Sequence, residues 1–267
     1  MRLLKRIDHN QRSRWSFEKD DEKFSWLNNI FTSRYANDLK HISILSEFHS
    51  FLTKNEGYKY SGHFYRYAMT MVRLLRHIPD PSGMTILETG GSSPLLDFLA
   101  HHNDCYHTES DLRLAFDCPD SWADLILSLE VFEHLKDQPE KSFDEVVLFQ
   151  GSGTRQFAQE ADRCLKPGGF LILTTPNALA AIVMKRFPYG EVPMVFRPHV
   201  REYSKAEIVD CFSDFDLIYY ESMYNFFDMH DDGAIVLKQI AQLGGKTVDR
   251  GDDHFFCFRK AQRSIAN

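Results

Sequence analysis

The sequence predicts an α/β fold: a doubly wound, mostly parallel sheet with a helical cap at the N-terminal end. Strand-like apolar runs alternate with helix-like segments between residues 84 and 260, as such a sheet requires. Ala123–Leu129 is a largely apolar run, which is typical of a strand buried on both faces of a parallel sheet. The chain has 267 residues, of which 43% are hydrophobic, and this is enough for one such domain with an added cap.

The N-terminal third is predicted to be helical and to form the cap. Within residues 1–80, Phe64–Ile78 has apolar residues at helical spacing and stops before the proline- and glycine-rich segment 79–83. We therefore expect a cap and substrate region over residues 1–82 and a sheet domain over residues 83–267. The basic residues close to the N-terminus are expected to form a solvated tail.

Apolar runs and turn signals divide the sheet domain into its elements. Expected strands are Met84–Glu88, Cys105–Glu109, Ala123–Leu129, Phe170–Thr174, Phe215–Glu221 and His254–Arg259, and expected helices are Pro94–His101, Thr154–Leu165, Lys205–Phe212 and Ala234–Leu243. The Lys-Pro-Gly-Gly segment at residues 166–169 is expected to stop the helix before it. Ser204, with Glu207 three residues later, has the pattern of a capping box at a helix start.

Charge and cysteine usage limit the possible partners and compartment. The net charge is −7, which makes a nucleic-acid partner unlikely because phosphate binding needs a basic surface. The five cysteines are scattered, with no C-x-x-C pair, and Cys164 and Cys257 lie in apolar segments typical of core thiols. The sequence starts without the apolar stretch of a signal peptide and has no run long enough for a membrane span. A cytoplasmic location is therefore predicted.

Three segments carry the functional signal: Ile86–Pro94, with its Gly90-Gly91 turn, Trp122–Leu135 and Glu160–Asn177. In this order they resemble the class I S-adenosylmethionine (SAM)-dependent methyltransferases, over roughly residues 84–260. The resemblance implies a Rossmann-like sheet whose final strand is antiparallel to its neighbours.

The resemblance also implies a SAM site beyond the carboxyl ends of the strands. Glu88 would serve the amino-acid end of SAM, and Glu109, about 20 residues later, would bind the ribose diol. Asp111 is the alternative ribose acid. The cofactor-binding residues expected from the resemblance are Glu88, Gly90, Gly91, Ser92, Glu109, Asp111, Leu112 and Ser128. Ser92 and Pro94 replace two further glycines of the family pattern, so the way the loop supports SAM differs from that pattern.

A second group of residues indicates the reactive site. If residues 129–136 form a helical turn, Glu130, Glu133 and His134 share one face of it. Two carboxylates and an imidazole are suited to a divalent ion. His199 lies in a later segment, residues 197–203, which is similar to one in methyltransferases of polysaccharide gene clusters.

Two chemical interpretations of these four residues remain open. Glu130, Glu133, His134 and His199 match the positions that hold magnesium in small-RNA ribose 2′-O-methyltransferases, and the E-x-x-E-H segment is also similar to ubiquinone-pathway O-methyltransferases. Mg²⁺ would then acidify a substrate hydroxyl as a Lewis acid. Without a metal, His199 or His134, next to Glu133, would be the general base.

These features together predict a SAM-dependent O-methyltransferase that acts on a sugar, a glycan or another polyol hydroxyl. The cap and the loop Phe187–Phe196 would cover the substrate, with His63, Tyr65 and Tyr67 as candidate contacts. One alternative is a small-RNA ribose 2′-O-methyltransferase, which the acidic net charge disfavours. Another is a non-catalytic SAM-fold subunit, which the altered glycine loop favours. The oligomeric state stays open.

Overall fold

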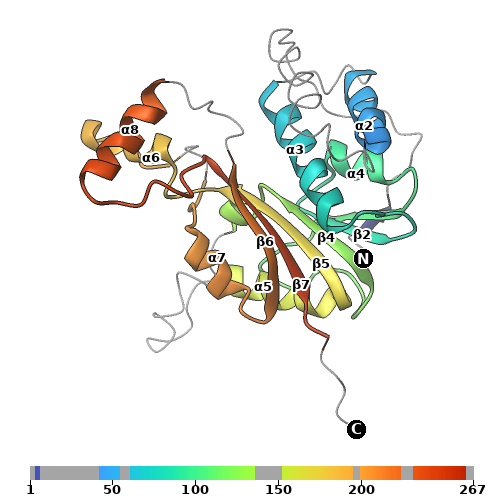
Figure 1. The fold of residues 1–267 in the computed structure, drawn as a ribbon. Helices are drawn as coiled ribbons and strands as arrows, with labels where there is room; N and C mark the ends of the chain where they lie inside the picture. Colours follow the sequence, from blue (N-terminus) through green and yellow to red (C-terminus); the bar gives the residue numbers. More distant parts are fainter. Residues whose placement is uncertain are drawn as a thin grey trace, which may run out of the picture.

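A computed structural model of the chain describes residues 4–6, 42–54, 61–135, 152–194, 199–223 and 231–262 (Figure 1). This part contains a seven-stranded sheet with the order β1-β3-β2-β4-β5-β7-β6. The strands are β1 (Leu4–Arg6), β2 (Thr85–Thr89), β3 (Asp104–Thr108), β4 (Ala123–Leu129), β5 (Leu165–Pro176), β6 (Phe215–Met223) and β7 (Asp253–Lys260). Strands β2 to β5 pair in parallel, whereas β7 is antiparallel to both β5 and β6. The mostly parallel sheet with an antiparallel last strand is confirmed.

Helices cover both faces of the sheet. The covering helices are α2 (Ile42–Lys54), α3 (Ser61–His77) and α4 (Pro94–Leu99) on one face, and α5 (Ser152–Cys164) and α7 (Lys205–Cys211) on the other (Figure 1). Successive residues of a strand point to opposite faces. Accordingly, Ile86 and Phe255 belong to the core with α2, α3 and α4, whereas Leu87 and Phe256 belong to the core with α5 and α7. None of the described helices combines the length and apolar character of a membrane span.

Residues 4–6 correct the expectation that the N-terminal region is helical throughout. They form β1, which pairs antiparallel with β3 through Leu4 and Thr108. β1 pairs with the edge of β3 that β2 leaves open, and three residues are too few to show a strand period in sequence.

The Pro-Gly-Gly segment also behaves differently from its prediction. It does not separate a helix from a strand, because β5 already begins at Leu165 and runs through Pro167 and Gly168. The pairing of β4 with β5 shifts register at this point, as expected where proline supplies no N–H group to the ladder. Gly168 has a φ of +80°, which suits glycine better than any other residue.

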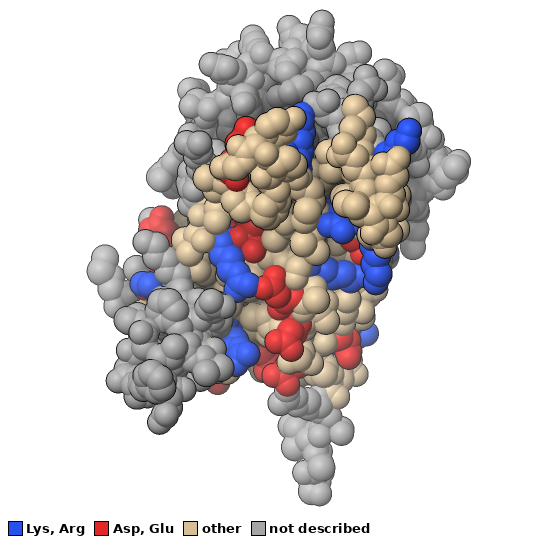
Figure 2. Space-filling model, turned by 90° about the vertical axis from the view of Figure 1, so that its left-hand side faces the viewer, with Lys and Arg blue, Asp and Glu red and all other residues tan. Residues whose placement is uncertain are grey.

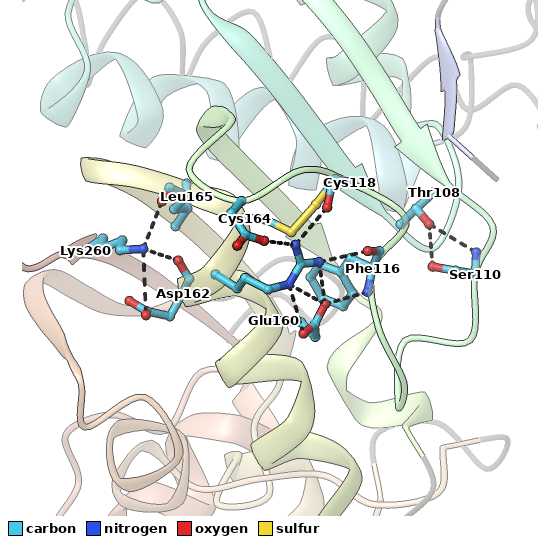
Figure 3. Close-up of a disulfide and its surroundings, with 11 residues drawn as sticks. Thr108, Ser110, Phe116, Cys118, Glu160, Asp162, Cys164, Leu165 and Lys260 are labelled. Atoms are coloured by element: carbon cyan, nitrogen blue, oxygen red, sulfur yellow. Dashed lines mark hydrogen bonds and ion pairs between the residues drawn. A yellow bond between two sulfur atoms is a disulfide. The ribbon is translucent and has the colours of Figure 1, made fainter. Parts of the chain in front are cut away.

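A disulfide between Cys118 and Cys164 corrects the expectation that Cys164 is a core thiol (Figure 3). The two cysteines are 46 residues apart in sequence, but they meet because Ala123 at the start of β4 pairs with Leu165 at the start of β5. Arg163 strengthens the junction by donating from Nη1 to the carbonyl of Cys118, at 2.8 Å. The cysteine pattern therefore no longer supports a reducing compartment.

Two further helices, α6 (Ala181–Arg186) and α8 (Asp231–Gln242), extend beyond the sheet together with the short 3₁₀ helix η4 (Phe187–Tyr189) (Figure 1). α6 follows the end of β5, and α8 precedes β7, so both lie at the carboxyl edge of the parallel strands. η4 occupies the start of the predicted covering loop, of which residues 195–196 lie outside the described part of the chain.

Candidate active site

The turn after β2 needs glycine at its first position. Gly90 has a φ of +81° and Gly91 a φ of +125°, both in the region that favours glycine. A Cβ atom added at Gly90 would lie 2.7 Å from Cγ2 of Val131, whereas one added at Gly91 would meet nothing within 4 Å. The turn therefore packs directly against the segment that follows β4.

Hydrogen bonds support this turn where the further glycines of the family pattern are missing. The buried carboxylate of Glu88 accepts a hydrogen bond from the backbone N–H of Ser93 at 2.7 Å. Ser93 caps α4 by accepting from the N–H of Leu96 at 3.2 Å. The hydroxyl of Ser92 donates to Asp97 at 2.9 Å. Burial raises the pKa of Glu88 to about 8.

The two candidate ribose acids have different surroundings. Glu109 is exposed directly after β3. Asp111 is held by Arg113, whose Nε and Nη2 atoms donate to its carboxylate at 2.9 and 2.7 Å. These hydrogen bonds lower the pKa of Asp111. Leu112, the residue after Asp111, is buried. The loop that carries it is tied to α5 by the disulfide (Figure 3).

Two buried hydroxyls lie near the carboxyl ends of β4 and β5. Ser128 and Thr174 are fully buried, and within the described residues neither hydroxyl oxygen has a hydrogen-bond partner. Leaving such a group unsatisfied costs about 1–3 kcal/mol, so both positions favour contact with a ligand or water. The sequence interpretation included Ser128 and missed Thr174, although a polar residue that follows an apolar strand core is a visible signal.

Glu133, His134 and His199 converge at the same edge of the sheet. Oε1 of Glu133 lies 3.7 Å from Nε2 of His134 and 3.9 Å from Nε2 of His199. The two imidazole rings are 5.0 Å apart between centroids. One nitrogen or oxygen atom from each residue lies within 4.8 Å of the others, which is close enough for the three to share one cation.

The surroundings of Glu133 make this cluster electrostatically unusual. Its carboxylate is fully buried, and Oε2 accepts from the hydroxyl of Thr175 at 2.9 Å, whereas Oε1 has no hydrogen-bond partner among the described residues. Burial, reinforced by the negative charge of Glu130, raises the pKa of Glu133 well above its usual range. Burial and the nearby His199 lower the pKa of His134. A cation or a proton held between the three side chains would stabilise the buried negative charge of Glu133.

Glu130 does not join the cluster, which corrects the expectation that it shares a helical face with Glu133 and His134. Its φ is +57°, and the 3₁₀ helix η2 (Phe132–His134) begins only after it. Oε2 of Glu130 instead lies 3.5 Å from Nη1 of Arg66 on α3. A left-handed non-glycine residue of this kind is strained, and such strain often occurs at functional sites.

Arg66 and Thr175 are site residues that the sequence interpretation missed. Arg66 is buried, and its Nη2 donates to the hydroxyl of Tyr67 at 3.2 Å. Tyr67 was an expected contact, whereas the side chains of His63 and Tyr65 lie outside the described part. Arg66 and Arg73 are seven residues apart, which places both cations on the same side of a helix that is apolar between them, and this is the signal that was available.

The site therefore spans both faces of the sheet edge. Arg66 and Glu130 lie on the face covered by α3. Thr175 follows the alternation of Leu171 and Leu173 and so belongs, together with Glu133, to the face covered by α5 and α7.

This arrangement defines a class of protein: a doubly wound sheet that binds a ligand beyond the carboxyl ends of its central strands, next to a glycine turn and a helix start. The family model described as a methyltransferase domain matches residues 61–221, which is more than half of the chain. The chain therefore belongs to this family of methyltransferase domains. A search of curated protein sequences gave no significant match.

Several solved structures are similar to parts of the chain. A SAM-dependent methyltransferase from Archaeoglobus fulgidus is 12% identical, with a TM-score of 0.42 over 73% of this chain and 96% of that one. Phosphoethanolamine N-methyltransferase 2 from Haemonchus contortus, in complex with SAM, is 14% identical, with a TM-score of 0.44 over 73% of this chain and 52% of that one. A SAM-dependent methyltransferase from Mesorhizobium loti is 13% identical, with a TM-score of 0.38 over 71% and 97% of the two chains. Similarities of this size say nothing about the acceptor.

Proposed function

We propose that the protein transfers the methyl group of SAM to a hydroxyl of a sugar, a glycan or another polyol. The observation that carries this proposal is the convergence of Glu133, His134 and His199, because these side chains supply what a hydroxyl acceptor needs: a site for its proton and a site for its oxygen. The resemblance of the His199 segment to methyltransferases of polysaccharide gene clusters supports a sugar acceptor.

SAM would bind over the glycine turn, with its ribose on the acid that follows β3. Glu109 is the preferred ribose ligand because it is exposed directly after β3, about 20 residues after Glu88. Glu88 would serve SAM indirectly, since its carboxylate fixes the turn through Ser93. The hydroxyls of Ser128 and Thr174 would contact the ligand at the carboxyl ends of β4 and β5.

In the base-catalysed version of the reaction, the acceptor hydroxyl gives its proton to Nε2 of His199 while its oxygen attacks the methyl carbon. The C–O bond forms as the C–S bond breaks, and S-adenosylhomocysteine leaves. Glu133, held in place by Thr175, would stabilise the imidazolium that forms. The remaining work of the protein is to align the two reactants and to exclude water.

A divalent ion also fits this cluster. Oε1 of Glu133 is buried and finds no hydrogen-bond partner in the part of the chain that the structure describes, and the Nε2 atoms of two histidines lie within 4 Å of it. Two imidazoles and one carboxylate suit Mn²⁺, Fe²⁺ or Zn²⁺ better than Mg²⁺, which prefers oxygen ligands. Such an ion would polarise the acceptor hydroxyl as a Lewis acid. Glu130 is paired with Arg66 and is no longer a candidate ligand.

A small-RNA ribose methyltransferase would use the same cluster, but the charge of the chain disfavours it. The net charge is −7, and Figure 2 shows a face on which Lys and Arg side chains are interspersed with Asp and Glu. RNA backbone contacts need a basic surface.

Labelled SAM incubated with fractionated glycans, nucleotide sugars and small RNAs tests the proposal directly. Transfer to a glycan or sugar fraction is expected. The variant His199→Ala should lower transfer by about 10²–10⁴-fold, with SAM affinity unchanged, and the exposed His102→Ala is the matched control. Transfer only to RNA would establish the alternative acceptor, and SAM binding without any transfer would favour a non-catalytic subunit. Chelation by EDTA, with Mn²⁺ or Mg²⁺ added back, separates the metal-dependent reaction from the base-catalysed one.

A further inference from the structure

His199 makes a short, buried hydrogen bond through the ring nitrogen that faces away from the cluster. Its Nδ1 atom lies 2.7 Å from Oε1 of Glu202, and the two side chains are only 6% and 2% exposed. An ionised carboxylate can only accept hydrogen bonds, so the hydrogen of this pair belongs to Nδ1. A neutral imidazole carries one N–H, and Nε2 of His199 is then left with its lone pair.

That lone pair faces the reactive cluster. Nε2 of His199 is 3.9 Å from Oε1 of Glu133, which accepts no hydrogen bond from the described residues. If the ring carried its proton on Nε2 instead, this atom would present an N–H group to the cluster and would have no lone pair for the proton of an acceptor hydroxyl or for a cation. The tautomer of His199 therefore decides whether the cluster can accept a proton or hold a cation.

The segment that carries both residues is fixed independently of their contact. The backbone N–H groups of Val200 and Arg201 donate to the carbonyl of Glu133, at 3.1 and 3.3 Å. The carbonyl of Tyr203 accepts from Nε2 of His254 at 3.1 Å, and Ser204 then begins α7 with a complete capping box. Glu202 is thus held opposite His199 by the backbone on both sides of it. Arg201 pairs with Glu207.

We propose that Glu202 is a positioning residue: it holds His199 in the Nδ1–H tautomer and so keeps its Nε2 atom available to the acceptor hydroxyl or to a cation. The effect of this contact on catalysis rests on the function proposed above. The tautomer of His199 itself does not depend on which acceptor the protein uses. Carboxylates that hydrogen-bond the far nitrogen of a functional histidine commonly set its orientation in this way.

Long-range ¹H–¹⁵N correlation spectra of protein labelled with ¹⁵N-histidine report the tautomer without any activity measurement. At pH 8, where imidazoles are generally neutral, His199 is expected to show the Nδ1–H pattern, assigned by its loss in His199→Gln. In Glu202→Ala the pattern is expected to change to Nε2–H, with methyl transfer lowered about 10- to 100-fold in kcat and the KM for SAM unchanged. Glu202→Asp should partly restore both.

Glu207→Ala is the matched control, because it disturbs the same segment at the capping box without touching His199. The tautomer should stay Nδ1–H in this variant. The proposal is overturned if wild-type His199 is Nε2–H, if Glu202→Ala leaves it Nδ1–H, or if Glu207→Ala changes it equally. If the tautomer changes as expected but His199→Ala transfers methyl groups at the wild-type rate, the positioning contact stands and the proposed role of His199 in the reaction fails.

Discussion

Gly90→Ala is the substitution whose effect follows most directly from the geometry of the site. The new Cβ atom would lie 2.7 Å from Cγ2 and 3.1 Å from Cγ1 of Val131. Both methyl groups belong to the valine side chain, and its Cβ atom, at 3.5 Å, would be in ordinary contact. Val131 would therefore have to rotate or shift, and it leads directly into η2, which carries Glu133 and His134.

The magnitude has two parts, which a second glycine separates. A φ of +81° costs an alanine about 1–2 kcal/mol relative to glycine. The overlap with Val131 adds about 1–3 kcal/mol, the usual range for an overpacked site. Gly83 has a similar φ of +72°, and a Cβ there would meet nothing within 4 Å. Gly83→Ala should therefore lose only the free energy that the positive φ costs.

Urea denaturation and SAM calorimetry on both variants measure these parts. Gly90→Ala should lose about 2–5 kcal/mol of unfolding free energy and bind SAM more weakly, whereas Gly83→Ala should lose about 1–2 kcal/mol and bind SAM normally. A double-mutant cycle with Val131→Ala should show that the two residues are coupled. Equal losses in the two glycine variants, with no coupling to Val131, would refute the packing argument. Unchanged SAM affinity in Gly90→Ala would mean that the cofactor lies elsewhere.

Three further predictions concern other parts of the molecule. Glu109→Ala should weaken SAM binding by about 10- to 100-fold, the range for a lost hydrogen bond to a charged group, while Asp111→Asn leaves it nearly unchanged; the reverse order in calorimetry would exchange their roles. Cys118→Ser should lower the unfolding free energy by up to about 4 kcal/mol, because the Cys118–Cys164 disulfide closes a loop of 46 residues, and a reductant should have the same effect on the wild type but none on the variant. Burial lowers the pKa of His254 to about 4, so the unfolded chain binds its proton first as the pH falls below about 6.5. The resulting loss of stability between pH 6.5 and 4, up to about 3 kcal/mol, should be absent in His254→Gln, and an unchanged pH profile in that variant would contradict the assignment.

Six of the seven strands in the described part of the chain were predicted from the sequence alone, whereas the three-residue β1 was missed. Ala123–Leu129 was predicted with its observed bounds because a strand buried on both faces must be apolar along its length. The capping box at Ser204 and Glu207 was also predicted, because its hydrogen bonds join residues only three positions apart. Patterns of this kind are local, and one residue's neighbours in sequence are enough to specify them.

Tertiary structure alone decided which distant residues meet. Sequence resemblance proposed that His199 joins Glu133 and His134, but only the docking of its segment on the carbonyl of Glu133 brings their side chains together. The disulfide of Cys118 was missed for the same reason, since no spacing rule links positions that meet through the pairing of β4 with β5. Glu130 was misplaced because its left-handed backbone turns its side chain toward Arg66 on α3. A helical period cannot anticipate such a reversal, because the energy that maintains it comes from contacts remote in the chain.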